Sequence, residues 1–221
     1  GSKKQLRMEF FYREGRRRFD VLMDRDQPQG GQWNFDQDNR KPPPKGLEGP
    51  EPLWFEPDAI TSAVISKLNR LAERYELPGT SDPFCWGVSQ QQAQEVLEHF
   101  IATRLEGFGP YQDAMVSGQP TLWHSLISPY INLGLLQPLA VIRQLEHAGR
   151  EREIPLASLE GVIRQLLGWR EFTHGLYHHF GEDYSHSNAL EALEPLPEFL
   201  HQLGGSGMGC VDTVLGELNE R

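Results

Sequence analysis

The chain has 221 residues, of which 38% are hydrophobic and 24% charged, and its formal net charge is −10 at pH 7. This composition indicates a water-soluble globular protein of one or two domains. The acidic balance argues against a general nucleic-acid binder, which usually presents a basic face. Two cysteines, Cys85 and Cys210, do not form a disulfide framework, and no apolar run approaches the roughly 20 residues of a membrane span. We therefore expect a cytoplasmic protein without membrane contact.

The first part of the chain predicts a basic helix followed by a long loop. Residues 5–18 place several arginines opposite an apolar side that includes Met8 and Tyr12, which is typical of a solvated surface helix. Residues 24–46 are rich in turn formers, including a Gly-Gly pair and three consecutive prolines. Trp33 and Phe35 lie inside this loop, and we expect them to pin it to a surface. A domain boundary is placed near residues 40–50.

The rest of the chain is predicted to be mainly helical. Helical spacing of apolar residues covers 57–75, 89–104, 138–148, 155–180 and 210–221. Pro57 and Asp58 suit the first turn of one helix, and Ser89 is expected to cap the next. Residues 106–120 and 185–200 are predicted to be irregular, the second with a short helix.

Residues 121–136, TLWHSLISPYINLGLL, form a helix start with features of an anion site. His124, Ser125 and Ser128 place polar hydrogens beside free backbone N–H groups, and Pro129 suits a first turn. An apolar helical run is expected to follow. Such a helix start can accept phosphate, although an ordinary capped core helix explains the local sequence at least as well.

Residues 155–180 contain a second candidate ligand segment. Gly168 inside a predicted helix indicates that another element approaches closely there. The Arg170–Glu171 pair, beside Trp169 and Phe172, is suited to one side of a planar aromatic ligand site. His174 and His178, four residues apart, allow a metal interpretation, but a polar helix face is the preferred one.

Four segments together resemble the deoxyribodipyrimidine photolyase-related family, which comprises iron–sulfur bacterial cryptochromes and (6-4) photolyases. They are GGQWNFDQDNRK at 30–41, FGPYQDAM at 108–115, HSLISPYINLGLLQP at 124–138 and EGVIRQLLGWREF at 160–172. Their order and spacing also match, and the resemblance covers nearly the whole chain.

The resemblance implies an N-terminal α/β domain with a ribityllumazine antenna, a linker, and a helical domain that binds FAD. Residues 1–45 would be the tail of the α/β domain with the linker, and residues 46–221 the first part of the helical domain. In the family, a four-cysteine [4Fe–4S] cluster lies near the C-terminus. Light-excited reduced FAD donates an electron to a (6-4) lesion flipped out of damaged DNA.

The resemblance also assigns site residues. It implies that FAD is held by Tyr111, by His124, Ser125, Leu126 and Ser128, and by Trp169 and Arg170, with Arg164 and Gln165 as weaker candidates one turn earlier. Cys210 matches the first cysteine of the cluster.

The chain departs from the family pattern in several places. Most of the α/β domain, three cluster cysteines and the usual histidine pair are missing, so the cluster and the antenna are expected to be absent. Gln202 stands where a tryptophan for electron transfer is usual. We therefore expect an incomplete or truncated relative that is inactive alone. A cryptochrome-type photoreceptor and a non-catalytic relative without cofactor are the alternatives to a repair protein.

Overall fold

The structure, a computed structural model, describes residues 5–77 and 79–220. Its chain divides into two compact units, Gly1–Leu53 with Ser89–Tyr184 and Trp54–Val88 with Ser185–Arg221. The division between an antenna tail and a helical domain at residue 45 stays a prediction. No helix in the described part of the chain combines the length and apolar character needed to cross a membrane.

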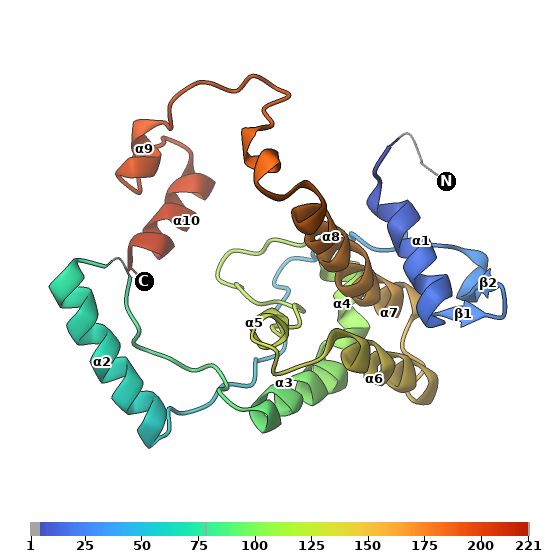
Figure 1. Ribbon diagram of the computed structural model, residues 1–221. Coiled ribbons are helices and arrows are strands. Elements are labelled where there is room, and N and C mark those ends of the chain that lie inside the picture. The colour runs from blue at the N-terminus through green and yellow to red at the C-terminus, as the bar shows by residue number, and fades with distance from the viewer. Residues whose placement is uncertain (1–4, 78, 221) are drawn as a thin grey trace. The chain divides into compact units, whose positions relative to one another are not determined.

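The first unit carries most of the secondary structure (Figure 1). Its elements are α1 (Met8–Phe19), β1 (Met23–Asp24), β2 (Gln27–Pro28), η1 (Gln29–Gly31), α3 (Gln90–Thr103), α4 (Leu105–Tyr111), α5 (Ser128–Asn132), α6 (Pro138–Glu151), α7 (Leu156–Ile163), η2 (Arg164–Arg170) and α8 (Glu171–Phe180). The 3₁₀ segment η3 (Gly181–His186) follows. The second unit contains α2 (Ala59–Tyr75), α9 (Glu198–His201) and α10 (Gly209–Glu220). The mainly helical class is confirmed, and β1 and β2 form one short antiparallel ladder.

Two predicted helix starts are confirmed at the level of hydrogen bonds. The Asp58 carboxylate accepts the Thr61 N–H at 2.7 Å at the start of α2. Ser89 and Gln92 form a reciprocal capping box at the start of α3. Both caps satisfy N–H groups that have no partner inside the helix, so the start of each helix is specified by local sequence.

The prediction of an irregular 106–120 segment is wrong in its first part, because residues 105–111 form α4. Ser158, which is fully buried on α7, accepts the Gly109 N–H at 3.1 Å and donates to the Glu106 carbonyl at 2.7 Å. A side chain at Gly109 would lie 2.6 Å from the Ser158 hydroxyl. The glycine that suggested a loop therefore permits close packing of α4 on α7.

The predicted helix over 155–180 is continuous but changes its winding. Residues 164–170 form the π-helix η2 between α7 and α8. Of the apolar positions expected to face the core, Leu159, Ile163, Leu166 and Leu167 are buried, whereas Leu156 is half-buried. At Gly168, an added Cβ would lie 2.9 Å from the Met8 sulfur. The close approach predicted from this glycine is confirmed, and the approaching element is α1.

The loop at 30–41 is held against α1, as expected from its aromatic residues. The guanidinium groups of Arg13, Arg16 and Arg17 lie 5.7, 5.3 and 4.6 Å from the Trp33 ring centroid. Arg16 is fully buried and also donates to the Trp33 carbonyl at 3.0 Å. Stacked guanidinium groups attract an aromatic face, so Trp33 attaches the loop to the basic helix.

Candidate functional site

The segment around α5 differs from its sequence prediction. The N-terminal flanking residue is Ile127, no side chain caps the helix, and α5 ends at Asn132. The chain then turns at Gly134, which has φ of 75°, so the expected apolar helical run to residue 136 is wrong. Gly134 interrupts the run because it adopts a left-handed conformation that a helix cannot continue. A five-residue helix has a small macrodipole, so any anion affinity here must come mainly from side chains.

His124 to Ile127 lie in an irregular stretch just before α5, and Ser128 is the first residue of α5. Leu126 has φ of 57°, in the left-handed region that L-residues rarely adopt. His124 and Ser128 are exposed, whereas Ser125 and Leu126 are half-buried. Strained backbone of this kind persists only where its surroundings hold it in place.

Arg104, the residue between α3 and α4, supports this stretch. Its buried guanidinium donates to the His124 carbonyl at 2.9 Å and to the Pro50 carbonyl. Packing of the surrounding chain lowers the pKa of His124, the positive charge of Arg104 lowers it further, and Asp113 opposes both. The His124 imidazole is therefore neutral at pH 7, where it can donate or accept a hydrogen bond but adds no positive charge.

Tyr111 lies against this stretch through an aromatic contact. Its ring centroid is 4.9 Å from that of Trp123, at an interplanar angle of 38°. The indole of Trp123 rests on the backbone of α4, where a side chain at Gly107 would lie 2.2 Å from the indole nitrogen. Tyr111 and His124, predicted to serve the same ligand, are thus brought together by the residue that precedes His124.

A chain of ion pairs joins three of the four resembling segments. Asp36 pairs with Arg164 and with Arg40, both at 2.7 Å. Arg40 also pairs with Asp113 at 3.0 Å, and Arg164 lies 3.3 Å from Glu160. We call these five residues the charge relay. It connects the 30–41 loop, the end of α4, and the α7–η2 helix.

The charge relay ends in the protein interior at Glu160. The Glu160 side chain is fully buried, and its carboxylate accepts the Phe35 N–H at 3.2 Å. Burial raises the pKa of Glu160, against the opposing charge of Arg164. Burial and the neighbouring Glu160 carboxylate raise the pKa of Tyr12 well above its ordinary value. Burial at the inner end of the relay therefore disfavours the ionised form of these acidic groups.

The weaker candidates Arg164 and Gln165 face this interior. Arg164 is nearly buried and engaged by Asp36 and Glu160. The Gln165 side-chain amide Nε2 donates to the Gln112 side-chain oxygen Oε1 at 3.5 Å. This contact links η2 to the residue after Tyr111. Both side chains thus contact protein groups that position the Tyr111 segment.

Trp169 and Arg170 lie at the C-terminal end of η2 and are more open. The Trp169 side chain is 48% exposed, and its ring meets the Phe172 ring edge-on at 6.4 Å. Arg170 pairs with Glu171 at 2.5 Å. Within the described residues, Arg170 Nε and Gln112 Nε2 are buried donors without a hydrogen-bond partner. Orphaned donors of this kind fit a polar ligand.

Sequence reasoning missed the charge relay as a unit. A signal was present, because each of three quoted segments contains at least one of its members: Asp36 and Arg40, Asp113, and Glu160 and Arg164. Pairing between residues more than a hundred positions apart has no local pattern, however, so the sequence alone did not predict which charges meet.

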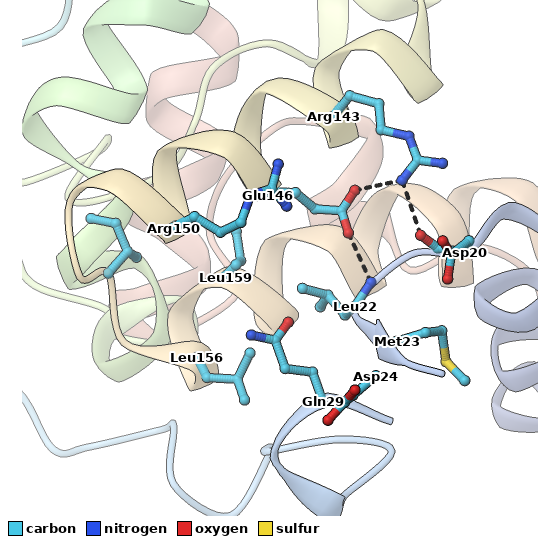
Figure 2. A pocket seen from close by; sticks show the side chains of 12 residues that line it. Asp20, Leu22, Met23, Asp24, Gln29, Arg143, Glu146, Arg150, Leu156 and Leu159 are labelled. Atoms are coloured by element: carbon cyan, nitrogen blue, oxygen red, sulfur yellow. Dashed lines mark hydrogen bonds and ion pairs between the residues drawn. The ribbon is translucent and has the colours of Figure 1, made fainter. Parts of the chain in front are cut away.

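A cavity of the first unit lies elsewhere (Figure 2). It has a volume of about 480 Å³ and lies between the β1–β2 region and α6. Arg143 donates to Glu146 at 2.7 Å and to the Asp20 carbonyl at 3.0 Å, and Glu146 accepts the Leu22 N–H at 2.8 Å. Arg143 and Glu146 thus bind each other and the backbone of residues 20 and 22, and none of the predicted FAD residues lines this cavity.

Cys210 lies exposed near the start of α10, in the second unit, and both cysteines are free. No three histidine, cysteine or acidic side chains in the described part of the chain are arranged to hold a metal ion. A four-cysteine cluster needs four thiolates, and the sequence has two. The residues present therefore do not fit the iron–sulfur cluster.

Comparison with known proteins agrees with the sequence resemblance. Residues 1–86 match the family model of deoxyribodipyrimidine photo-lyase-related protein. A (6-4) photolyase of Agrobacterium fabrum is 43% identical over 219 residues, which are 99% of this chain and 43% of that protein. Uncharacterized protein R853 of Acanthamoeba polyphaga mimivirus is 38% identical over 74 residues, 33% of this chain and 57% of that protein. The chain spans roughly half the length of these two relatives. The predicted family resemblance is confirmed.

Proposed function

The chain is related to the deoxyribodipyrimidine photolyase-related family, and we propose that it forms one wall of the FAD site of a light-dependent DNA-repair protein. The observation that carries the proposal is the convergence of the four resembling segments. The charge relay joins three of them, and the Tyr111–Trp123 contact places the residue just before the fourth segment against Tyr111.

The side chains suited to FAD divide by their chemistry. Arg170, with its orphaned Nε, would donate to a polar edge of the ligand, and Trp169 offers an open aromatic surface beside it. Ser125 and Ser128 supply hydroxyl groups for phosphate oxygens. His124, being neutral, would contribute a hydrogen bond without charge.

Arg164 and Gln165 have a positioning role in this proposal. Arg164 forms ion pairs with Asp36 and Glu160, and the Gln165 side chain forms a hydrogen bond with Gln112. They would hold η2 and the Tyr111 segment in place while Tyr111 itself lines the ligand. Preorganisation of this kind reduces the cost of ordering side chains on binding.

FAD, when bound, would supply the light-excited electron donor. The related Agrobacterium protein is named a (6-4) photolyase, so we propose damaged DNA with (6-4) pyrimidine lesions as the substrate of the whole protein. The part of the site described here would serve to bind and orient the cofactor.

Flavin binding tests the proposal directly. We would reconstitute the purified chain with FAD, remove free flavin by dialysis, and measure the bound flavin absorbance over a range of FAD concentrations. The variant Ser125→Ala with Arg170→Ala should bind FAD about 10- to 100-fold more weakly, because a hydrogen bond to a charged group contributes about 1.5–3 kcal/mol.

A matched double variant controls for general effects of the substitutions. Ser66→Ala with Arg18→Ala removes the same two side-chain types at exposed positions of α2 and α1. It should bind FAD as the unaltered chain does. Equal affinity of both double variants would contradict the site, and a chain that takes up no flavin would contradict the proposed function.

A further inference from the structure

The exposed face of α8 carries a pair of histidines that face each other. His174 and His178 are separated by four residues, so their side chains lie on the same side of the helix. Their rings meet edge to face, with centroids 4.5 Å apart at 78°, and their Nε2 atoms are 2.9 Å apart. Both side chains are exposed.

This face points away from the packed side of α8. Phe172, whose ring lies 5.9 Å from Phe11 of α1, marks the packed side. His174 is two residues further, which is about 200° around an α-helix of 3.6 residues per turn. A Cβ added at Gly175 would meet nothing within 4 Å. The two imidazoles are therefore accessible from solvent without any change in the fold.

We propose that His174 and His178 form a two-imidazole site for a late divalent transition-metal ion, of the Cu²⁺ or Ni²⁺ class. Histidine nitrogens bind metals at about 2.0–2.1 Å, so two of them in adjacent positions at a right angle are about 2.9 Å apart. A tetrahedral angle would need about 3.4 Å at the same bond lengths. The two Nε2 atoms are thus already close enough to occupy neighbouring positions on a tetragonal or octahedral ion, and water would fill the remaining positions.

The protons balance without an acid or base from the protein. In the metal-free pair, one Nε2–H donates to the lone pair of the other Nε2. Binding needs both Nε2 lone pairs, so that proton leaves Nε2 and is taken up through solvent by Nδ1 of the same ring. The hydrogen bond between the rings is replaced by two metal–nitrogen bonds.

Ni²⁺ is the suitable probe, because the free thiols of Cys85 and Cys210 can reduce Cu²⁺. The chain would be titrated with Ni²⁺ by calorimetry, and its amide signals would be followed by NMR, since bound paramagnetic Ni²⁺ broadens nearby resonances. We expect one ion per chain, with broadening centred on the C-terminal half of α8.

Variants separate this pair from other histidines. His174→Gln or His178→Gln should weaken Ni²⁺ binding by about tenfold or more, because even partners outside the coordination shell contribute about 10- to 100-fold to metal affinity. His147→Gln is the matched control, since His147 is also exposed and lies 3.2 Å from Glu151 four residues on, and it should leave the affinity unchanged. Cys210→Ser should also bind normally.

Three results would overturn the site. They are the absence of Ni²⁺ uptake, unchanged affinity in the His178→Gln variant, and broadening centred on Cys210 or His147 instead of α8. Far-UV circular dichroism of each variant shows whether α8 is still formed. Because the substituted side chains are exposed, we expect no loss of helix, so weaker binding reports on the ligands themselves.

Discussion

The absence of a side chain at Gly107 leaves room for the Trp123 ring, which contacts the Tyr111 ring. An added Cβ would lie 2.2 Å from the Trp123 indole nitrogen, so the ring would have to leave its contact with Tyr111. We expect Gly107→Ala to destabilise the fold by about 1–3 kcal/mol, the usual cost of overpacking. Urea unfolding would measure the free-energy change, and tryptophan fluorescence would report the displaced indole.

The control for Gly107 is a glycine with free space around it. Gly175 lies in the middle of α8 with nothing within 4 Å of its added Cβ. Gly175→Ala should be neutral or stabilise by up to about 1 kcal/mol, because alanine favours helices over glycine. Equal stability of the two variants would show that Trp123 does not depend on the space above Gly107.

His124 is expected to titrate below the ordinary histidine value of about 6.5. Although this residue is exposed at the surface, the chain packed around its imidazole and the charge of Arg104 both lower its pKa. A depressed histidine pKa contributes stability that is present above pH 6.5 and is lost as the pH falls through the lower folded value. The stability of the unaltered chain should therefore fall more steeply below pH 6.5 than that of His124→Gln. An NMR titration midpoint at or above 6.5 would contradict this assignment.

At the scale of elements, η2 and α1 pack closely against each other at Gly168, where there is no room for a side chain. Its added Cβ would lie 2.9 Å from the flexible Met8 side chain and 3.5 Å from the Tyr12 ring. We expect Gly168→Ala to destabilise the fold by about 1 kcal/mol or more. In a Met8→Ala background the same substitution should cost less, by about 0.5 kcal/mol or more in a double-mutant cycle. Additive free energies would show that α1 does not press on η2 at this point.

Elements with local signals were predicted well, and those decided by distant contacts were not. The caps at Asp58 and Ser89 lie in the sequence next to the helices they start. The helix α4 was missed because Gly107 and Gly109 look like loop residues until Ser158 and Trp123 are placed against them. The π-helix has the same apolar spacing as its neighbours, so periodicity did not reveal its wider turn.

The candidate site shows the same division. The motif residues Tyr111, His124 and Arg170 were predicted from sequence resemblance. The charge relay beside the Tyr111 segment was not predicted, because it joins side chains as far apart as Asp36 and Arg164. The orphaned Nε of Arg170 is likewise a property of the folded chain alone.

At the scale of the whole fold, the buried end of the charge relay makes stability depend on pH. Burial raises the pKa of Glu160 above the ordinary value of about 4.3. A raised carboxyl pKa contributes stability that is fully present below the unfolded value and is lost as the pH rises through the folded value. Exposed carboxylates such as Asp58, whose pKa is lowered by its bonds to Thr61, act in the opposite direction.

The variant Glu160→Gln separates these effects, because it keeps the shape of the side chain and removes only its titration. The opposing carboxylates are common to both proteins and cancel in the difference. We expect Glu160→Gln to gain stability relative to the unaltered chain as the pH rises from 4 to 8, by at most about 1.4 kcal/mol per pH unit. Urea unfolding at several pH values measures this difference. If the variant instead loses relative stability at higher pH, then the attraction of Arg164 outweighs the cost of burial, and Glu160 anchors the relay as a charged group.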